Sequence, residues 1–218
     1  MTLTIARSEL ILGGQKSGKS RRAELLARDW LAQSSTHRAV LVATAQPWDD
    51  EMRLRIARHQ TDRAQRVPGL QTHEEPFELA QTIRARSTPH TLLVVDCLTL
   101  WLTNLLMPFE PHQPNIPLDP PQTSQTSQNQ AEMAILMLNK PQAGVLHAYL
   151  ATFLEAILQS AGPIVLVGNE IGLGVIPMGR ETRSFVDALG RLNQDVAAAC
   201  QRVTFMAAGL PLTLKGQA

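Results

Sequence analysis

The sequence predicts an α/β fold in which a mainly parallel sheet carries helices on both faces. Short apolar runs bounded by turn residues alternate with helical patterns, and this alternation is typical of a parallel sheet because each parallel strand needs a crossover connection. The link at residues 208–211 is too short for a helix, so residues 212–214 should return as a C-terminal antiparallel edge strand. The other strands are expected at residues 10–12, 39–44, 92–96, 164–167 and 203–207.

The composition limits the class of protein. Of 218 residues, 44% are hydrophobic and 18% are charged, which allows one substantial core, so we expect a single domain over residues 1–218. A formal net charge of +1 gives no long-range attraction to nucleic acid. No apolar run approaches the ~20 residues that span a bilayer, and the first residues lack a signal-peptide pattern. We therefore expect a cytoplasmic protein with no integral membrane segment. Cys97 and Cys200 form no C-x-x-C pair and should be small buried side chains.

One segment departs from this pattern. Residues 108–130 are rich in proline and end in a run of glutamine, serine and threonine from Gln122 to Gln130. So few large apolar side chains cannot offset the entropy lost on ordering, and we predict an exposed or disordered insertion at about 108–130. A helical pattern resumes at Ala131 and, after a break at Pro141, continues to Gly162.

The first predicted strand runs into a glycine-rich turn with the spacing of a phosphate-binding P-loop. Four residues separate Gly13 from Gly18-Lys19-Ser20, and an amphipathic helix follows. In such a loop the backbone N–H groups surround phosphates, the lysine reaches the outer phosphates, and the serine hydroxyl can ligate Mg²⁺. We predict a P-loop NTPase-type fold with Lys19 as a catalytic residue. The nucleotide-binding loop is Gly13, Gly14, Gln15, Lys16, Ser17, Gly18, Lys19 and Ser20.

Other strands should deliver residues to the same edge, because ligands of an open parallel sheet bind beyond the carboxyl ends of its strands. Ala43-Thr44-Ala45 are small enough to let a nucleotide approach the backbone. Asp96 ends an apolar strand, as expected of a Walker-B aspartate that supports Mg²⁺, although a turn-forming aspartate is the alternative. Asn169 and Glu170 follow the next strand on a glycine-rich loop, and we expect them to contact phosphate or substrate.

A histidine and an arginine share one side of the helix predicted after the second strand. Arg55 lies one turn before His59. A neutral imidazole can attack phosphorus while a guanidinium holds the phosphate oxygens. Periodicity alone favours the alternative, a partly buried histidine that completes an apolar face with Met52 and Ile56.

A further arginine lies near the start of a late helix. Arg183 and Asp187 are separated by one helical turn, and an ordinary surface ion pair is the default interpretation of such a pair. The preceding turn at residues 177–180 brings this helix back from the edge where the ligand is expected. We therefore also consider Arg183 a contact for phosphate or substrate.

Several separated stretches, taken together, point to one family. They are residues 13–20, 43–45, 50–52, 55–56, 59, 72–74, 96–106, 168–177, 183, 185, 187, 190–194 and 208–211. In these stretches the chain resembles the bifunctional adenosylcobinamide kinase/adenosylcobinamide-phosphate guanylyltransferases of cobalamin biosynthesis. The likeness covers nearly the whole chain outside the insertion, and the later stretches make it specific because many proteins share the P-loop.

The resemblance implies a transferase with two activities. A kinase step would pass a phosphate from ATP or GTP to adenosylcobinamide, and GTP would then transfer GMP through a histidine to adenosylcobinamide phosphate, with release of pyrophosphate. The guanylylated histidine of the family falls on His59. Its nucleotide-binding positions fall on the P-loop, on residues 43–45, on Glu74 and on Asp96, with Ser20 and Asp96 beside Mg²⁺. The family also implies a homotrimer.

The chain departs from the family pattern at Lys16, where arginine is usual, and in the loop after His59, at residues 66–70. Two other functions are compatible with a P-loop. One is a single-activity kinase of a small metabolite, in which His59 is structural. The other is a GTP-binding switch protein, which is disfavoured because the guanine-reading Asn-Lys-x-Asp signature is missing: Asn139-Lys140 is followed by Pro141-Gln142.

Overall fold

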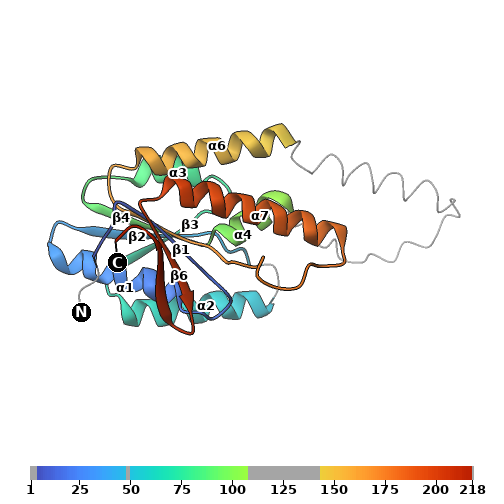
Figure 1. Ribbon diagram of the computed structural model, residues 1–218. Coiled ribbons are helices and arrows are strands. Elements are labelled where there is room, and N and C mark those ends of the chain that lie inside the picture. Colours follow the sequence, from blue (N-terminus) through green and yellow to red (C-terminus); the bar gives the residue numbers. More distant parts are fainter. Residues whose placement is uncertain (1–3, 48–49, 108–142, 218) are drawn as a thin grey trace, which may run out of the picture.

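A single sheet organises the chain (Figure 1). The computed structural model describes residues 4–47, 50–107 and 143–217. From one edge to the other, the sheet contains β3 (Leu70–Glu74), β2 (Arg38–Ala43), β4 (Thr91–Asp96), β5 (Ile164–Val167), β1 (Ser8–Gly13), β6 (Arg202–Ala207) and β7 (Leu210–Lys215). All neighbouring strands are parallel except β6 and β7, which pair antiparallel. The predicted mainly parallel sheet with a C-terminal antiparallel edge strand is confirmed.

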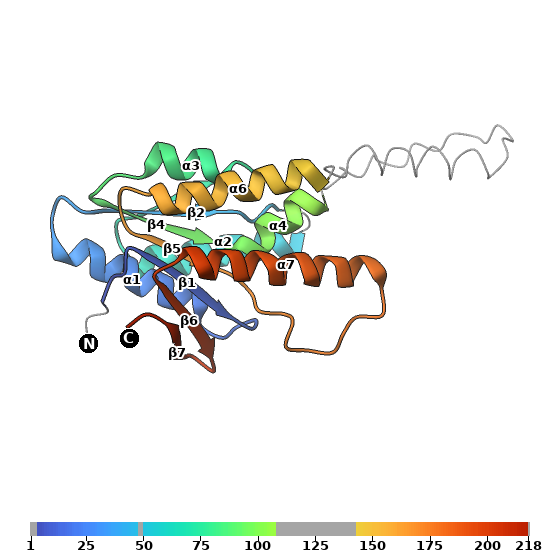
Figure 2. The same cartoon turned by 45° about the horizontal axis from the view of Figure 1, so that its top comes forward.

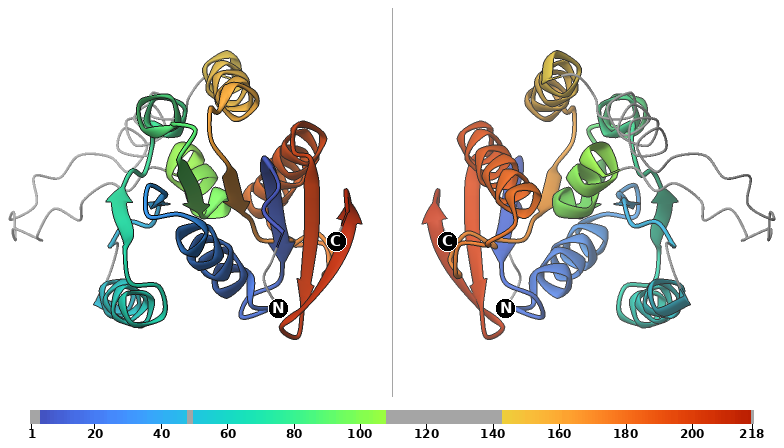
Figure 3. Two further views of the ribbon diagram at one scale, coloured as in Figure 1. Left: turned by 90° about the vertical axis from the view of Figure 1, so that its left-hand side faces the viewer. Right: turned by 90° about the vertical axis from the view of Figure 1, so that its right-hand side faces the viewer.

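Helices cover both faces of the sheet, as the end-on views in Figure 3 show. One face carries α1 (Lys19–Gln33) and α2 (Asp50–Arg66). The opposite face carries α3 (Leu79–Arg86), α4 (Leu98–Leu106), α6 (Ala143–Gln159) and α7 (Arg180–Ala199). Such covering explains why the central strands are apolar almost throughout, since both of their faces are removed from water.

Alternate residues of each central strand pack on opposite faces. On β1, Leu10 and Leu12 belong to the core beneath α3, α4, α6 and α7, whereas Ile11 belongs to the core beneath α1. Trp101 and Phe153 fill the larger core with their ring centroids 4.6 Å apart, and the indole N–H donates a hydrogen bond to a backbone carbonyl at 2.8 Å. The sheet is therefore a rigid platform for residues at the ends of its strands.

The edge strand β3 was not predicted. Its sequence, Leu-Gln-Thr-His-Glu, contains one apolar residue, and most of its side chains are exposed. A strand that is paired on one side and solvated on its faces needs no apolar run, so hydrophobic periodicity cannot reveal it. Its pairing with β2 puts Glu74 opposite Ala43. The missed strand therefore carries a predicted nucleotide-binding residue to the carboxyl edge of the sheet.

Some predictions concern residues outside the described ranges. The insertion at 108–130 and the helical pattern from Ala131 to Pro141 are among them, while α6 begins at Ala143. Cys97 and Cys200 are buried as predicted, and burial raises the pKa of each thiol to about 12. Among the helices of the described ranges, none combines the length and apolar character needed to cross a membrane.

Candidate functional site

The parallel strands bring their carboxyl ends to one edge of the sheet, at the right of the view in Figure 2. The strand register places Glu74 opposite Ala43, Ala43 opposite Asp96, and Asp96 opposite Val167. β1 continues beyond the end of β5 to Gly13. The predicted nucleotide-binding positions therefore share the edge at which ligands of open α/β sheets bind.

The turn after β1 has a conformation that depends on glycine. Gly13 has φ +151°, and a Cβ atom at this position would lie 2.4 Å from the carbonyl oxygen of Met206. Gly18 has φ +100° and precedes the first helical residue of α1. Ser17 is buried, while Gln15 and Lys16 are exposed. The loop therefore curls tightly between the end of β1 and the N-terminus of α1, which is a favourable place for an anion.

The turn between β6 and β7 supports this loop. Ala208 and Gly209 both have positive φ angles, 51° and 81°, as in a tight two-residue hairpin. The N–H group of Gly209 donates to the carbonyl of Ser17 at 3.0 Å, and the backbone of Gly209 packs against Gly18. The C-terminal hairpin therefore supports the P-loop at Ser17 and Gly18.

Lys19 is folded into the loop and is only 7% exposed. Its ammonium group donates to the carbonyl oxygen of Gly14 at 2.6 Å and lies 3.5 Å from the hydroxyl of Ser17. Burial lowers the pKa of Lys19 below its usual value, and the neighbouring Cys97 and Asp96 partly oppose this shift. An ammonium with so little water around it interacts strongly with an anion placed in the loop.

Ser20 and Asp96 are the two residues predicted to bind Mg²⁺. Ser20 lies in the first turn of α1, and Asp96 ends β4 close enough to Lys19 to influence its pKa. The described residues contain no cluster of three acidic, histidine or cysteine side chains that could hold a metal by themselves. Mg²⁺ does not require one, because it commonly takes one or two protein oxygens and completes its shell with phosphates and water. The donor set fits Mg²⁺ carried by a nucleotide.

Thr44 has a structural role at this edge of the sheet. Its side chain is 0% exposed, and its hydroxyl donates to the carbonyl of Cys97 at 2.8 Å and accepts from the N–H of Cys97 at 2.9 Å. Asn104 donates to the carbonyl of Thr44 at 2.8 Å. Thr44 therefore joins the ends of β2 and β4, and Ala43 and Ala45 on either side of it are partly exposed. Nucleotide contact by these residues stays a prediction.

The loop after β5 is anchored directly to the P-loop. The N–H group of Glu170 donates to the carbonyl of Gly13 at 3.1 Å, and that of Asn169 donates to the hydroxyl of Thr99 at 2.8 Å. The side chain of Asn193 on α7 donates to the carbonyl of Asn169 at 3.1 Å. Sequence reasoning assigned no role to Thr99 or Asn193, although both lie within the family-like stretches. Their bonds fix the backbone from which Asn169 and Glu170 project.

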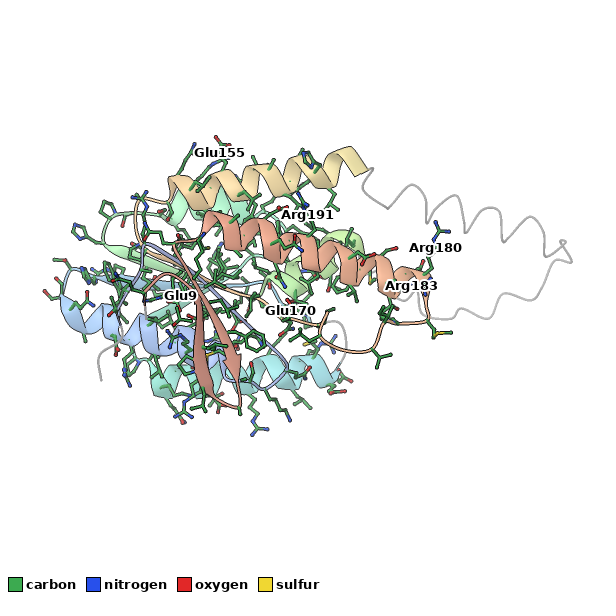
Figure 4. All side chains as sticks on the ribbon, in the orientation of Figure 1. Glu9, Glu155, Glu170, Arg180, Arg183 and Arg191 are labelled. Carbon is green, nitrogen blue, oxygen red and sulfur yellow. The ribbon has the colours of Figure 1, made fainter. Side chains whose placement is uncertain are left out.

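Arg183 contacts the same loop near its far end. Its guanidinium donates to the carbonyl of Pro177 at 3.0 Å and to that of Met178. Figure 4 shows Arg180 and Arg183 at the outer end of α7, whereas Glu170 lies nearer the strand ends. Arg183 therefore holds the loop that precedes α7. Its predicted contact with phosphate or substrate stays a prediction.

Arg55 and His59 lie on α2, but their side chains are outside the described part of the structure. The neighbouring Gln60 donates from its side-chain amide to the carboxylate of Glu74 at 3.4 Å. His59 therefore precedes, on α2, a residue whose side chain contacts Glu74 at the carboxyl edge of the sheet.

A buried charge cluster attaches α2 to α1. Glu24 on α1 is 3% exposed and accepts a hydrogen bond from Arg66 at 2.5 Å, with the Nε atom of Arg63 3.7 Å from its other oxygen. Arg63 also donates to the hydroxyl of Thr72 on β3 at 3.1 Å. Burial raises the pKa of Glu24, while Arg66 and Arg63 act in the opposite direction. These contacts set the position of α2 relative to the helix that begins at the P-loop.

Comparison with known proteins agrees with these features. Residues 9–214 match the family model described as cobinamide kinase / cobinamide phosphate guanyltransferase. The chain is 42% identical over 210 residues to the bifunctional adenosylcobalamin biosynthesis protein CobP of Pseudomonas aeruginosa, with 96% of this chain and 98% of that protein covered. It is 31% and 30% identical over 206 residues to the bifunctional adenosylcobalamin biosynthesis proteins CobU of Escherichia coli and Salmonella typhimurium, with 94% of this chain and 98% of each relative covered.

Proposed function

Because the chain belongs to the cobinamide kinase / cobinamide phosphate guanyltransferase family, we propose that it is a transferase with two successive activities on one corrinoid. In the first, the γ-phosphate of ATP or GTP passes to the aminopropanol hydroxyl of adenosylcobinamide. In the second, GMP from GTP passes through a guanylyl-histidine to the new phosphate, giving adenosylcobinamide-GDP and pyrophosphate. The observation that carries the proposal is the family match over residues 9–214.

The kinase step draws on the P-loop. The substrate hydroxyl oxygen bonds to the γ-phosphorus as the bond to the bridging oxygen of the nucleotide breaks, and the hydroxyl proton is released. Phosphoryl transfer of this kind depends mainly on positioning and on neutralising charge. The ammonium group of Lys19 suits the outer phosphates, and the P-loop amides suit the inner ones. Ser20 and Asp96 would hold Mg²⁺, which supplies further positive charge at the phosphate oxygens when it is bound.

The guanylyl step draws on α2. A ring nitrogen of His59 bonds to the α-phosphorus of GTP, and pyrophosphate leaves. An oxygen of the corrinoid phosphate then displaces the histidine and takes the GMP group. Arg55, one helical turn before His59, would hold phosphate oxygens, as would the side-chain amide of Asn169, whereas the carboxylate of Glu170 would contact a donor group of the substrate. The contact between Gln60 and Glu74 supports this assignment, since it links the His59 segment to the nucleotide-binding edge.

The guanylyl-histidine is tested by incubating the protein with GTP labelled at the α-phosphate, without corrinoid. We expect label that survives denaturation, is lost in acid and is absent from His59→Ala. A matched control is His147→Ala, an exposed histidine on α6. Equal labelling of His59→Ala and the unchanged protein would move the nucleophile elsewhere. No labelling at all, together with phosphorylation of adenosylcobinamide, would leave a single-activity kinase.

The partners follow from the same reactions. We propose adenosylcobinamide and its phosphate as substrates, with no nucleic acid bound, in agreement with a formal net charge of +1. A cytoplasmic location gives access to ATP and GTP. A homotrimer is the proposed assembly. A switch protein would bind GTP without turning over a corrinoid, so product formation from adenosylcobinamide separates the two functions.

A further inference from the structure

A cleft of about 510 Å³ lies between the loop that follows β5 and the face of α7. Ile171, Val175 and Ile176 line it from the loop, and Asp187 and Gln194 are among the residues that line it from α7. In Figure 2 the loop runs outward from the strand ends and turns back into the start of α7. The volume of the cleft is within the range of about 300–1,000 Å³ that is usual for small-molecule sites.

The loop presents an unusual amount of apolar surface to solvent. Leu173, Val175, Ile176 and Met178 are between 76% and 96% exposed. Single exposed apolar residues are common, but several in one short loop are typical of a binding surface. The loop is also fixed in place, because Glu170 bonds to the P-loop at one end and Arg183 holds the other.

The α7 wall of the cleft is mainly polar, although Val186 and Gly190 also belong to it. Arg183, Asp187, Arg191 and Gln194 line it, and they offer both hydrogen-bond donors and acceptors. Figure 4 shows Arg191 farther along α7 than Arg183. An apolar wall facing a polar wall suits a ligand with methyl-bearing rings and carboxamide side chains. A corrin ring has this chemistry, whereas a nucleotide alone does not call for so much apolar surface.

Hydrogen bonds join the segments that form the cleft to the P-loop. Gln194 follows Asn193, which bonds to the carbonyl of Asn169, and Glu170 bonds to Gly13. The anchored residues 168–170 therefore connect the loop that lines the cleft to the P-loop. We propose that this cleft binds one side of the corrin ring of adenosylcobinamide, so that the aminopropanol arm extends toward the γ-phosphate. The inference rests on the proposed function and adds the location of the corrinoid.

The two activities allow a sharp test, because guanylylation by GTP alone needs no corrinoid whereas the kinase step does. The double substitution Val175→Gln with Ile176→Gln changes exposed side chains, so folding should be unaffected. We expect a rise of roughly tenfold in the KM for adenosylcobinamide, since burial of two apolar contacts is lost. The KM for ATP and the labelling by GTP should stay unchanged. Gln194→Ala, on the opposite wall, should raise the same KM by a few fold.

The matched control is Leu158→Gln, an exposed leucine on α6 at the other end of the sheet, which should change neither KM. Equilibrium dialysis with cobinamide measures binding independently of either reaction. Unchanged KM and unchanged dialysis in the double variant would overturn the proposal. A change in oligomeric state with loss of all activities would also overturn it, and would make the loop a contact between copies. Failure of the unchanged protein to label with GTP would instead count against the proposed function, and dialysis would still decide the cleft.

Discussion

The pH range in which the side chain of Lys19 stays protonated depends on its surroundings. Burial lowers its pKa, so its proton is lost at a lower pH than from an ordinary lysine near 10.5. We predict that the affinity of the free protein for a nucleoside triphosphate falls as pH rises through this lowered pKa, below the pH at which an exposed lysine would titrate. Isothermal titration with a non-hydrolysable GTP analogue between pH 7 and 10.5 measures the effect. In Lys19→Arg, whose guanidinium keeps its charge, the alkaline loss should be absent. An affinity independent of pH across this range would contradict the role given to the ammonium group.

Lys19 and His59 should also separate the two reactions. Lys19→Ala removes the cation that we propose faces the phosphates in both steps, and we expect a loss on the order of 100-fold or more in each. His59→Ala removes only the proposed nucleophile, so guanylyl transfer should be abolished while phosphorylation of adenosylcobinamide continues. The measurement is the rate of each step with separately supplied adenosylcobinamide and adenosylcobinamide phosphate. If both variants lost the two activities to the same extent, the guanylyl step would not depend on His59 in the way proposed.

At the scale of single residues, the sequence identifies the functional residues whose type and spacing are required for phosphate binding. Gly13 and Lys19 could be recognised because their spacing is tied to phosphate binding. Thr44 was predicted only as part of the nucleotide-binding stretch and Asn193 was given no role, because each acts in the structure by bonding to a backbone group that is distant in sequence. Which carbonyl a buried amide or hydroxyl will face depends on the packing of strands and helices, and periodicity carries no such information.

Charged side chains attach the helix α2 to α1. Glu24 accepts from Arg66 and lies beside Arg63, and these contacts attach the C-terminal half of α2 to α1. We predict that Glu24→Gln lowers the free energy of unfolding by about 2 kcal/mol, less than for a fully enclosed pair because Arg66 is 39% exposed. Because α2 carries His59, guanylylation should fall more than phosphorylation. Urea unfolding and the two separate rates are the measurements.

The matched control for this substitution is Glu155→Gln. Glu155 also pairs with an arginine, Arg84, at 3.0 Å, but both side chains are exposed and lie on α6 and α3. An exposed pair contributes about 0–1 kcal/mol, so neither reaction should change. If Glu24→Gln slowed both reactions equally, Glu24 would serve only stability and not the position of α2.

Elements with a strong apolar pattern were predictable, and those without one were not. β1, β4 and β5 are buried, and each contains an apolar run, at residues 10–12, 92–95 and 164–167. β3 is polar because it lies at an edge, so its backbone pairing with β2 determines its structure and its side chains give little sign of it. The antiparallel β7 was predictable for a different reason, since chain length alone excludes a crossover helix between β6 and β7.

On the scale of the whole molecule, β7 leaves an apolar ridge at the edge of the sheet. Leu210, Leu212 and Leu214 alternate along the strand, so they share one side of it, and they are between 58% and 71% exposed. An exposed edge strand with such a ridge is a site for association between chains. We predict that the protein is a homotrimer and that this ridge is part of the contact between subunits.

Leu212→Asp should therefore shift the mass measured by light scattering from three copies of the 23.9 kDa chain toward one. The consequence should reach the nucleotide, because the hairpin that carries β7 also carries Gly209, whose N–H group holds Ser17 of the P-loop at 3.0 Å. A hairpin freed from its neighbouring subunit holds this loop less firmly, so we expect the affinity for GTP to fall by a few fold as the trimer dissociates. Leu158→Asp, on the exposed side of α6, should alter neither quantity. If Leu212→Asp is still a trimer, β7 is not part of the contact between subunits. If it is a monomer that binds GTP with full affinity, the hairpin supports the P-loop without help from another subunit.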